Sequence, residues 1–249
     1  MPFNMTISPD FKPELISGWY IFNTWLQKKI DTHIHIDLVN DFSELADAIN
    51  NNSIDLIYAN PCDIAKLVRE KEFTPIVQPV GTQDETIIVC NAQHPVDDIE
   101  TLSSGIKVAM TDVPDVNTIG LIMLEPADIS PADIEPVICR NYITVAKKLI
   151  NGEADIGFLL ADAYDEFSNL VKKQLHSIIS SKIHVLHHAF LAGPAFNEQQ
   201  KLQQALLFMN DDPAALQILN SLEIDKWQAM DREEAEFLID LMETLSPES

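Results

Sequence analysis

Side chains that could bind a small polar molecule follow several predicted strands of this 249-residue chain. Amides and hydroxyls donate and accept hydrogen bonds, tyrosine offers an aromatic face with a polar tip, and arginine pairs with carboxylate or phosphate-like groups. The candidate ligand-binding residues are Asp10, Phe11, Tyr58, Asn60, Cys62, Thr111, Asp112, Asn117, Thr118, Arg140, Asn141, Asp162 and Tyr164. We therefore predict a binding site assembled from loops that are far apart in the sequence.

These residues also have structural roles open to them. Asn117 and Asp162 could cap the helices that follow, and Asn60 with the next proline could begin a turn. Tyr58 stands in a predicted strand, where burial in the core is common. Arg140 could form a surface salt bridge instead of holding an anion. Both interpretations of each residue stay open from the sequence.

Signatures of catalysis are sparse in the sequence. It contains no Gly-rich phosphate loop, no Walker motif and no Gly-x-Ser-x-Gly elbow. Its histidines lack cysteine or carboxylate partners at the spacing of a zinc site. We expect no catalytic residue, no cofactor and no metal. The alternative is an enzyme that uses Cys62, a candidate reactive thiol at the start of a predicted helix, or a carboxylate of the binding site.

One pattern occurs twice, at residues 46–58 and 146–158. In each copy a helix runs into an Asn/Gly-type stop, and an aspartate, Asp55 or Asp155, then precedes a short apolar strand. The repetition predicts two similar α/β lobes. A cleft between two such lobes is a common place for a small ligand.

Strands and helices alternate along most of the chain, which favours parallel sheets with right-handed crossovers. The predicted strands are 5–8, 33–39, 54–59, 75–80, 85–90, 106–110, 134–139, 154–160 and 182–187. The predicted helices are 17–26, 42–50, 64–69, 97–102, 118–124, 143–150, 197–210, 213–222 and 232–244. We expect residues 1–88 and 187–249 to form a discontinuous first lobe and residues 89–186 to form the second.

The charge of the chain argues against some classes of binding partner. A net charge of −23 and a pI near 4.4 leave no basic surface for nucleic acid or an anionic membrane. No apolar run reaches the roughly 18 residues that span a bilayer.

The first residues lack the basic and apolar segments of a signal peptide, so we expect a cytoplasmic protein, or a periplasmic one if an export signal was removed. The three cysteines are far apart, which suits reduced thiols.

Several stretches, taken in order, resemble a known family. They are residues 54–61, the helix around 67–71, the strand at 75–77, the second repeat copy at 152–157, and the closing segments 206–213 and 218–222. Together they resemble the phosphate/phosphonate-type substrate-binding proteins of ABC transporters, which have the type 2 periplasmic-binding-protein fold. The resemblance implies two lobes, each a mostly parallel sheet flanked by helices, with a ligand cleft between them.

The resemblance also implies a function. It points to a non-catalytic protein that closes over a small polar ligand for sensing or uptake, with a protein partner that recognises the closed state. The family's ligands are phosphonate- or phosphate-like, but here the segment 111–118 carries Asp112 and Asp115 where the family has a Ser/Thr-rich turn. Because these carboxylates would repel a dianion, an amine-bearing or neutral ligand is the alternative. A protein-interaction module with a degenerate cleft is another.

Overall fold

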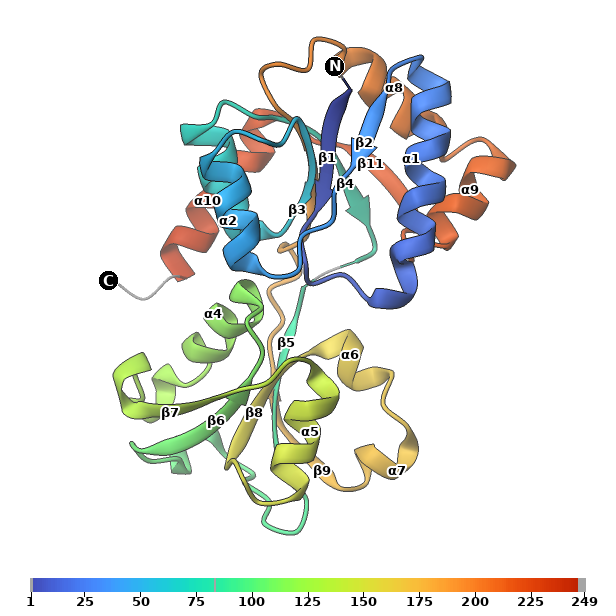
Figure 1. Ribbon diagram of the computed structural model, residues 1–249. Helices are drawn as coiled ribbons and strands as arrows, with labels where there is room; N and C mark the ends of the chain where they lie inside the picture. Colours follow the sequence, from blue (N-terminus) through green and yellow to red (C-terminus); the bar gives the residue numbers. More distant parts are fainter. Residues whose placement is uncertain (1, 83, 246–249) are drawn as a thin grey trace. The chain divides into compact units, whose positions relative to one another are not determined.

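The computed structural model describes residues 2–82 and 84–245 (Figure 1). The chain divides into two compact units, one formed by Met1–Gln83 with His187–Met242 and the other by Asp84–Leu186 with Glu243–Ser249. Each unit contains one sheet flanked by helices, so the predicted α/β fold class is confirmed. The lobe boundary expected after residue 88 falls inside a strand of the second unit, β5 (Thr86–Asn91).

The sheet of the first unit has the strand order β11-β4-β10-β3-β1-β2. Its strands are β1 (Phe3–Ile7), β2 (Ile34–Ile36), β3 (Leu56–Ala59), β4 (Thr74–Val80), β10 (Ala189–Ala192) and β11 (Lys226–Ala229). β1 pairs in parallel with β2 and β3, whereas β10 is antiparallel to β3 and β4. The carboxyl ends of β1 and β3 therefore lie at the same end of the sheet as the amino end of β10.

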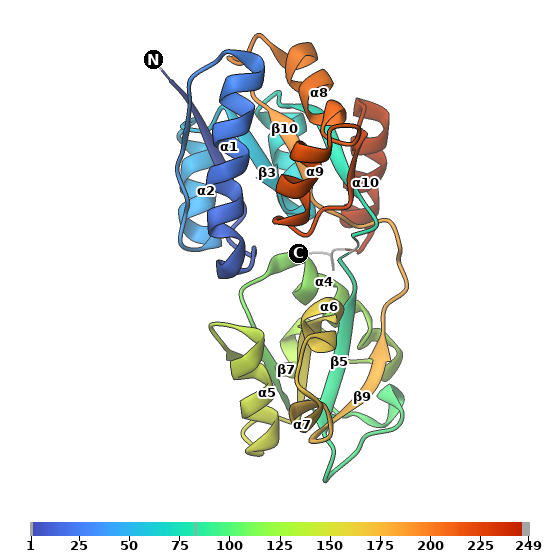
Figure 2. The same ribbon diagram turned by 90° about the vertical axis from the view of Figure 1, so that its right-hand side faces the viewer.

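Helices cover both faces of this sheet (Figures 1 and 2). They are α1 (Ile16–Ile30), α2 (Phe42–Asn50), α3 (Pro61–Ala65), α8 (Gln199–Phe208), α9 (Pro213–Asn220) and α10 (Arg232–Leu245), with a 3-10 turn at Pro13–Leu15 and a π-helical turn at Lys66–Glu70. α1, α8 and α9 lie on one face, and α2 and α10 on the other. The core under α1 is aromatic, since Trp19, Phe22 and Phe190 are almost completely buried there.

The sheet of the second unit has the order β7-β6-β8-β5-β9. Besides β5, its strands are β6 (Ile106–Met110), β7 (Ile134–Ile138), β8 (Ile156–Leu160) and β9 (Leu175–Ser180). Its helices are α4 (Pro114–Ile122), α5 (Tyr142–Ile150), α6 (Ala161–Asp165) and α7 (Asn169–Lys172), with 3-10 turns at Ile99–Thr101, Glu125–Ala127 and Pro131–Asp133. The sheets of the two units are mixed and not mostly parallel as expected, because β4, β5, β9, β10 and β11 enter antiparallel pairs.

Strand β8 separates two helices of the second unit. A Cβ on Gly157 would meet Val145 and Leu149 of α5, whereas the ring of Phe158 fills the space beside Gly120 of α4. Because successive strand residues point to opposite faces, α4 and α5 lie on opposite sides of the sheet.

The repeated aspartates have the same role in both units. Asp55 Oδ2 accepts a hydrogen bond from the backbone N–H of Asn4 at 2.8 Å, and Asp155 Oδ2 accepts one from the backbone N–H of Lys107 at 2.7 Å. Asn4 and Lys107 lie on β1 and β6, the parallel neighbours of β3 and β8. Each aspartate therefore ties the start of its own strand to the strand beside it.

The predicted strand at 182–187 is wrong. The carboxylate of Glu85 accepts hydrogen bonds from the backbone N–H groups of Ile183 at 3.2 Å and His184 at 2.6 Å, and from the Ser181 hydroxyl. His184 has a left-handed φ of 59°, which a strand does not permit. The flanking segments instead form β9 and β10.

Other boundaries also differ from the prediction. The helix expected at 118–124 begins earlier, at Pro114, where proline occupies the first helical position. The helix expected at 97–102 is a single 3-10 turn at Ile99–Thr101. The sequence does not predict β11, which is short and has just one buried residue, Trp227.

Candidate functional site

A polar cluster lies at the end of the first sheet where β1 and β3 finish and β10 begins. Asp10 follows β1, Asn60 follows β3 and His188 precedes β10. Asp10 Oδ2 accepts a hydrogen bond from Asn60 Nδ2 at 2.8 Å and lies 3.0 Å from His188 Nε2. We refer to Asp10, Asn60 and His188 as the Asp10 cluster. It joins three segments that are far apart in the chain.

Asn60 is held in place by its own backbone and by the helix that it starts. It is fully buried, and its backbone N–H donates to Ser8 Oγ at 2.8 Å. As the N-cap of α3, its Oδ1 accepts from the backbone N–H of Cys62 at 2.9 Å. Asn60 thus caps a helix with one side of its amide and holds Asp10 with the other.

The carboxylate of Asp10 is buried and ionised. Its side chain is 8% exposed. Burial alone would raise the pKa of Asp10, but the charge of the His188 imidazolium and the hydrogen bonds from His188 and Asn60 outweigh burial and hold that pKa below 3.8. Within residues 2–82 and 84–245, its buried Oδ1 has no hydrogen-bond partner. Oδ1 of Asp10 is therefore an unused acceptor on an ionised carboxylate whose other oxygen is paired with His188.

Asp63, on α3, titrates in the opposite direction. Burial and then the nearby charge of Asp10 raise the pKa of Asp63 to about 6. Its Oδ2 is buried and also lacks a hydrogen-bond partner in the described part of the chain. The two carboxyl groups thus differ in protonation below about pH 6, with Asp10 ionised and Asp63 largely neutral.

Aromatic rings support His188. The Tyr58 ring stacks on the His188 imidazole at 5.1 Å between centroids, with 21° between the planes. Trp19 lies 5.1 Å and Trp227 6.0 Å from the Tyr58 ring. This packing fixes the imidazole against Asp10. Phe11, the next residue after Asp10, is partly buried and packs against the same core.

In the second unit, the candidate residues again follow parallel strands. Thr111 comes after β6, Arg140 after β7 and Asp162 after β8. Asn117 Nδ2 donates to the backbone oxygen of Thr111 at 2.8 Å. Thr111 Oγ1 and Asn117 Oδ1 are both buried, and neither has a hydrogen-bond partner in the part of the chain that the structure describes. Thr111 and Asn117 form a second small polar group, here uncharged.

Capping explains some of the candidate residues of the second unit and not others. Asn117 lies inside α4, whose N-cap is Val113, so the capping interpretation of Asn117 is wrong. Asp162 lies within the first turn of α6 and is not its N-cap. Asn141 does cap α5, since its Oδ1 accepts from the backbone N–H of Thr144 at 2.9 Å.

The remaining candidates differ in exposure. Arg140 and Asp112 are exposed, and Thr118 is partly buried on α4. The Tyr164 ring packs against Phe167 at 6.2 Å between centroids. Asp115, in the first turn of α4, is 1% exposed, which is unusual for a carboxylate.

Five residues of the Asp10 surroundings are missing from the sequence-based candidates: Ser8, Trp19, Asp63, His188 and Trp227. A usable signal was the histidine pair directly before the apolar run 189–192. The histidine pair is missed because the segment before it resembles a strand. It is also missed because β10 runs antiparallel to β3, so that the amino end of β10 lies beside the carboxyl end of β3.

The described residues offer neither a metal site nor a membrane-spanning helix. No group of three or more His, Cys, Asp or Glu side chains in 2–82 and 84–245 could hold a metal ion. No helix among these residues is long and apolar enough to cross a membrane.

Comparison with known proteins identifies the family. A family model described as an ABC transporter phosphonate periplasmic substrate-binding protein matches residues 5–235. PhnD1 from Prochlorococcus marinus, solved in complex with methylphosphonate, has 12% sequence identity and a TM-score of 0.80, and the alignment covers 98% of this chain and 97% of that chain. No curated protein sequence matches this chain.

Two further solved structures are similar. The binding protein component of an ABC phosphonate transporter from Pseudomonas aeruginosa has 14% identity and a TM-score of 0.75, over 98% of this chain and 87% of that chain. The periplasmic aliphatic sulphonate binding protein SsuA from Escherichia coli has 13% identity and a TM-score of 0.65, over 98% of this chain and 86% of that chain. At these identities the structures establish the fold.

The family model spans most of the chain, and the resemblance seen in the sequence is thereby confirmed. Neither an enzyme nor a pure protein-interaction module is favoured. The family is one of periplasmic proteins, and the expectation of a cytoplasmic location finds no support in it. The chain belongs to the phosphonate-type periplasmic substrate-binding proteins of ABC transporters, which bind solutes without catalysis.

Proposed function

We propose that this protein binds a small solute that carries a positively charged amine, and that Asp10 recognises the amine. The observation that carries the proposal is the unpartnered Oδ1 of an ionised, buried carboxylate. A buried charged acceptor without a donor costs free energy, and a ligand N–H removes that cost. Hydrogen bonds between an ammonium and a carboxylate are also stronger than neutral ones.

The rest of the solute is proposed to be a phosphonate-like group, since one similar structure holds methylphosphonate and another is named an aliphatic sulphonate binding protein. We propose Thr111 and Arg140 as candidate ligand contacts of the second unit, the first through a hydroxyl donor and the second through a cation. An aminoalkylphosphonate carries less net negative charge than a simple phosphonate. It is therefore repelled less by a chain whose net charge is −23.

The wider function follows the family. We propose that the two lobes expected from the sequence close over the solute, and that a transporter subunit is the partner that recognises the loaded form. We also propose a location outside the cytoplasm. Fractionation of cells that express the full native reading frame tests the location, because recovery in the cytoplasmic fraction would contradict it.

Calorimetric titration tests the ligand class with three matched probes: 2-aminoethylphosphonate, ethylphosphonate and ethylamine. We expect the aminophosphonate to bind most tightly. Asp10→Asn should weaken its binding by about 10- to 100-fold, as expected for a charge-assisted hydrogen bond, and should change ethylphosphonate binding much less. Asp211→Asn, at an exposed aspartate of the same unit, is the matched control and should change neither.

Two outcomes would contradict the proposal. One is tighter binding of ethylphosphonate than of the aminophosphonate by the natural protein. The other is an equal loss of affinity for 2-aminoethylphosphonate and for ethylphosphonate in Asp10→Asn. Such a result would mean that the substitution disturbs the site without removing an amine contact. The tryptophan emission spectrum of each variant confirms that the first unit remains folded.

A further inference from the structure

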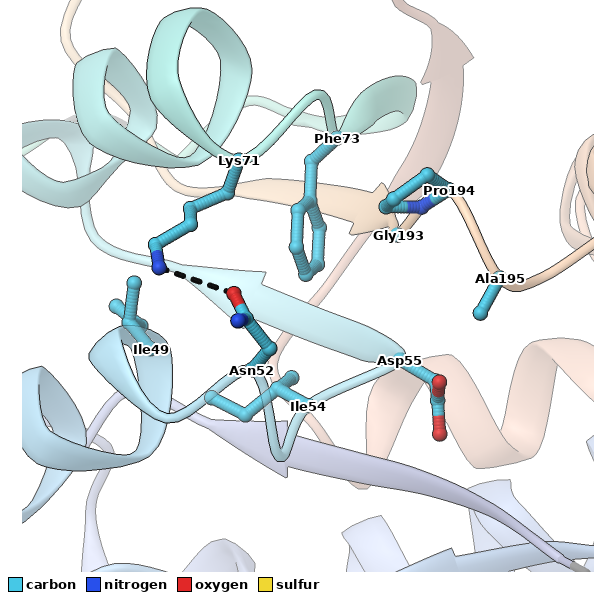
Figure 3. Close-up of a pocket in the computed structure, with 9 residues that line it drawn as sticks. All are labelled: Ile49, Asn52, Ile54, Asp55, Lys71, Phe73, Gly193, Pro194 and Ala195. Carbon is cyan, nitrogen blue, oxygen red and sulfur yellow. Dashed lines mark hydrogen bonds between the residues drawn. The ribbon is translucent and has the colours of Figure 1, made fainter.

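A pocket of about 120 Å³ lies in the first unit, at the opposite end of its sheet from the Asp10 cluster (Figure 3). Its walls come from the loop before β3, the residues before β4 and the loop after β10. Because β10 is antiparallel to β3 and β4, its carboxyl end lies beside their amino ends. A four-residue strand separates the two ends of the sheet by about 13 Å. The pocket is therefore distinct from the proposed amine site.

One end of the pocket is cationic. Lys71 Nζ donates to the backbone oxygen of Asn50 at 3.1 Å and to Asn52 Oδ1 at 2.9 Å. Both acceptors are neutral, and an ammonium has a third N–H to donate. Because Asn52 accepts through its oxygen, its Nδ2 is a second donor at the same end, as Figure 3 shows.

The carboxylate that also lines this pocket does not neutralise Lys71. Asp55 Oδ2 accepts the hydrogen bond from the backbone N–H of Asn4 that ties β3 to β1. In Figure 3 the Asp55 carboxylate points away from Lys71. In the part of the chain that the structure describes, the hydrogen bonds of the Lys71 ammonium thus go to two neutral oxygens, which leave its charge uncompensated.

The opposite wall is apolar and tightly built. Phe73 is 7% exposed, and its ring stands between Lys71 and Gly193 in Figure 3. A Cβ on Gly193 would lie 3.1 Å from Phe73 Cζ, and the Gly193 N–H donates to the backbone oxygen of Asp55 at 2.7 Å. Ile54 adds a second apolar side chain. This wall is held in place by backbone contacts.

The other copy of the repeat shows what the helix end needs by itself. In the second unit, Asn91 Nδ2 donates to the backbone oxygens of Leu149 at 3.0 Å and Ile150 at 3.2 Å, at the end of α5. A neutral amide therefore suffices to satisfy such a helix end. Lys71 does the same for α2 but also places a positive charge beside an apolar hollow, and this charge is the feature that suggests a ligand.

We infer that this pocket binds a short-chain aliphatic monocarboxylate. The carboxylate accepts hydrogen bonds from Lys71 and Asn52, and the alkyl chain lies against Phe73 and Ile54. A cavity of about 150 Å³ accommodates one benzene molecule, which has six non-hydrogen atoms, so a volume of 120 Å³ suits about five such atoms, close to the size of butyrate. For so small a ligand we expect a Kd of about 1–10 mM.

Titration of the ¹⁵N-labelled full chain with butyrate tests this inference. We expect saturable amide shifts at Asn52, Phe73 and Gly193, and no such shifts with butylamine or 1-butanol, which have the same number of carbon atoms as butyrate. Lys71→Met should weaken butyrate binding at least about tenfold. Lys28→Met, at an exposed lysine of α1, makes the same charge change and should leave binding unchanged. Asp10→Asn should also leave it unchanged, so failure of the amine proposal would be seen separately.

A second variant guards against loss of the fold in Lys71→Met. Ala195→Leu keeps the ammonium and fills the pocket, and it should abolish the butyrate shifts while the rest of the spectrum is preserved. The inference is overturned if butyrate gives no saturable shifts in the millimolar range. Equal shifts with 1-butanol or butylamine, or unchanged butyrate binding in Lys71→Met or in Ala195→Leu, would overturn it as well.

Discussion

Replacing Asp63 with asparagine should stabilise the first unit, and more strongly at neutral than at acidic pH. The pKa of Asp63 is raised from 3.8 to about 6 by burial and by the charge of Asp10. Asparagine has nearly the same shape but cannot ionise. The substitution therefore removes the cost of burying a carboxylate next to another one.

The magnitude follows from linkage between ionisation and folding. Below pH 3.8 the carboxyl is protonated in both the folded and the unfolded chain, so it contributes no penalty. As the pH rises from 3.8 to 6, ionisation of the unfolded chain increasingly favours unfolding, and above 6 the penalty is constant. At 1.36 kcal/mol per pKa unit, Asp63→Asn should raise the free energy of unfolding by about 3 kcal/mol at pH 7.5 but by about 1 kcal/mol at pH 4.5.

Tryptophan fluorescence measures this effect in the first unit alone. The three tryptophans of the chain, Trp19, Trp25 and Trp227, all belong to that unit. Urea unfolding followed by their emission therefore gives its stability at each pH. Asp211→Asn, at an exposed position of the same unit, is the control and should shift the urea unfolding curve at neither pH 7.5 nor pH 4.5. Destabilisation by Asp63→Asn at pH 7.5 would refute the reasoning. An equal increase in the free energy of unfolding at pH 7.5 and at pH 4.5 would refute it as well.

Substitutions at three further positions have definite expected outcomes. Gly120→Ala places a Cβ 2.5 Å from Phe158 Cδ2, so it should destabilise the second unit by about 1–3 kcal/mol and lower its thermal midpoint in circular dichroism. Asp155→Ala removes the acceptor of the Lys107 N–H, and hydrogen exchange at that amide should accelerate. Glu85→Ala should accelerate exchange of the backbone amides that its carboxylate binds, and Glu85→Gln, which keeps an acceptor oxygen, should do so less.

Local signals in the sequence predict some elements with their exact limits. The helix at 42–50 and the strand at 106–110 have the predicted limits. For the helix, the reason is visible in the structure: Asp41 caps its start, and Asn52 adopts a left-handed φ of 52° just beyond its end. Both signals lie within a few residues of the boundary that they set.

Features that depend on distant parts of the chain are less predictable. Asp10 and Asn60 are expected at strand ends, and they are in contact. His188 is not expected there, because its place depends on the antiparallel direction of β10. The raised pKa of Asp63 depends on Asp10, which is 53 residues earlier in the printed sequence. Short-range patterns carry no information about either relation.

The position of β10 in the sheet has a consequence for synthesis on the ribosome. β10 joins β3 to β4, yet it is translated after the whole segment 84–186. That segment is nearly all of the second unit, and its ends are adjacent, since the Asp84 N–H donates to the Leu186 oxygen at 2.9 Å. Nascent domains generally fold as units in order of emergence. Here that order is inverted: the second unit can fold first, and the apolar edges of β3 and β4 stay open until β10 emerges.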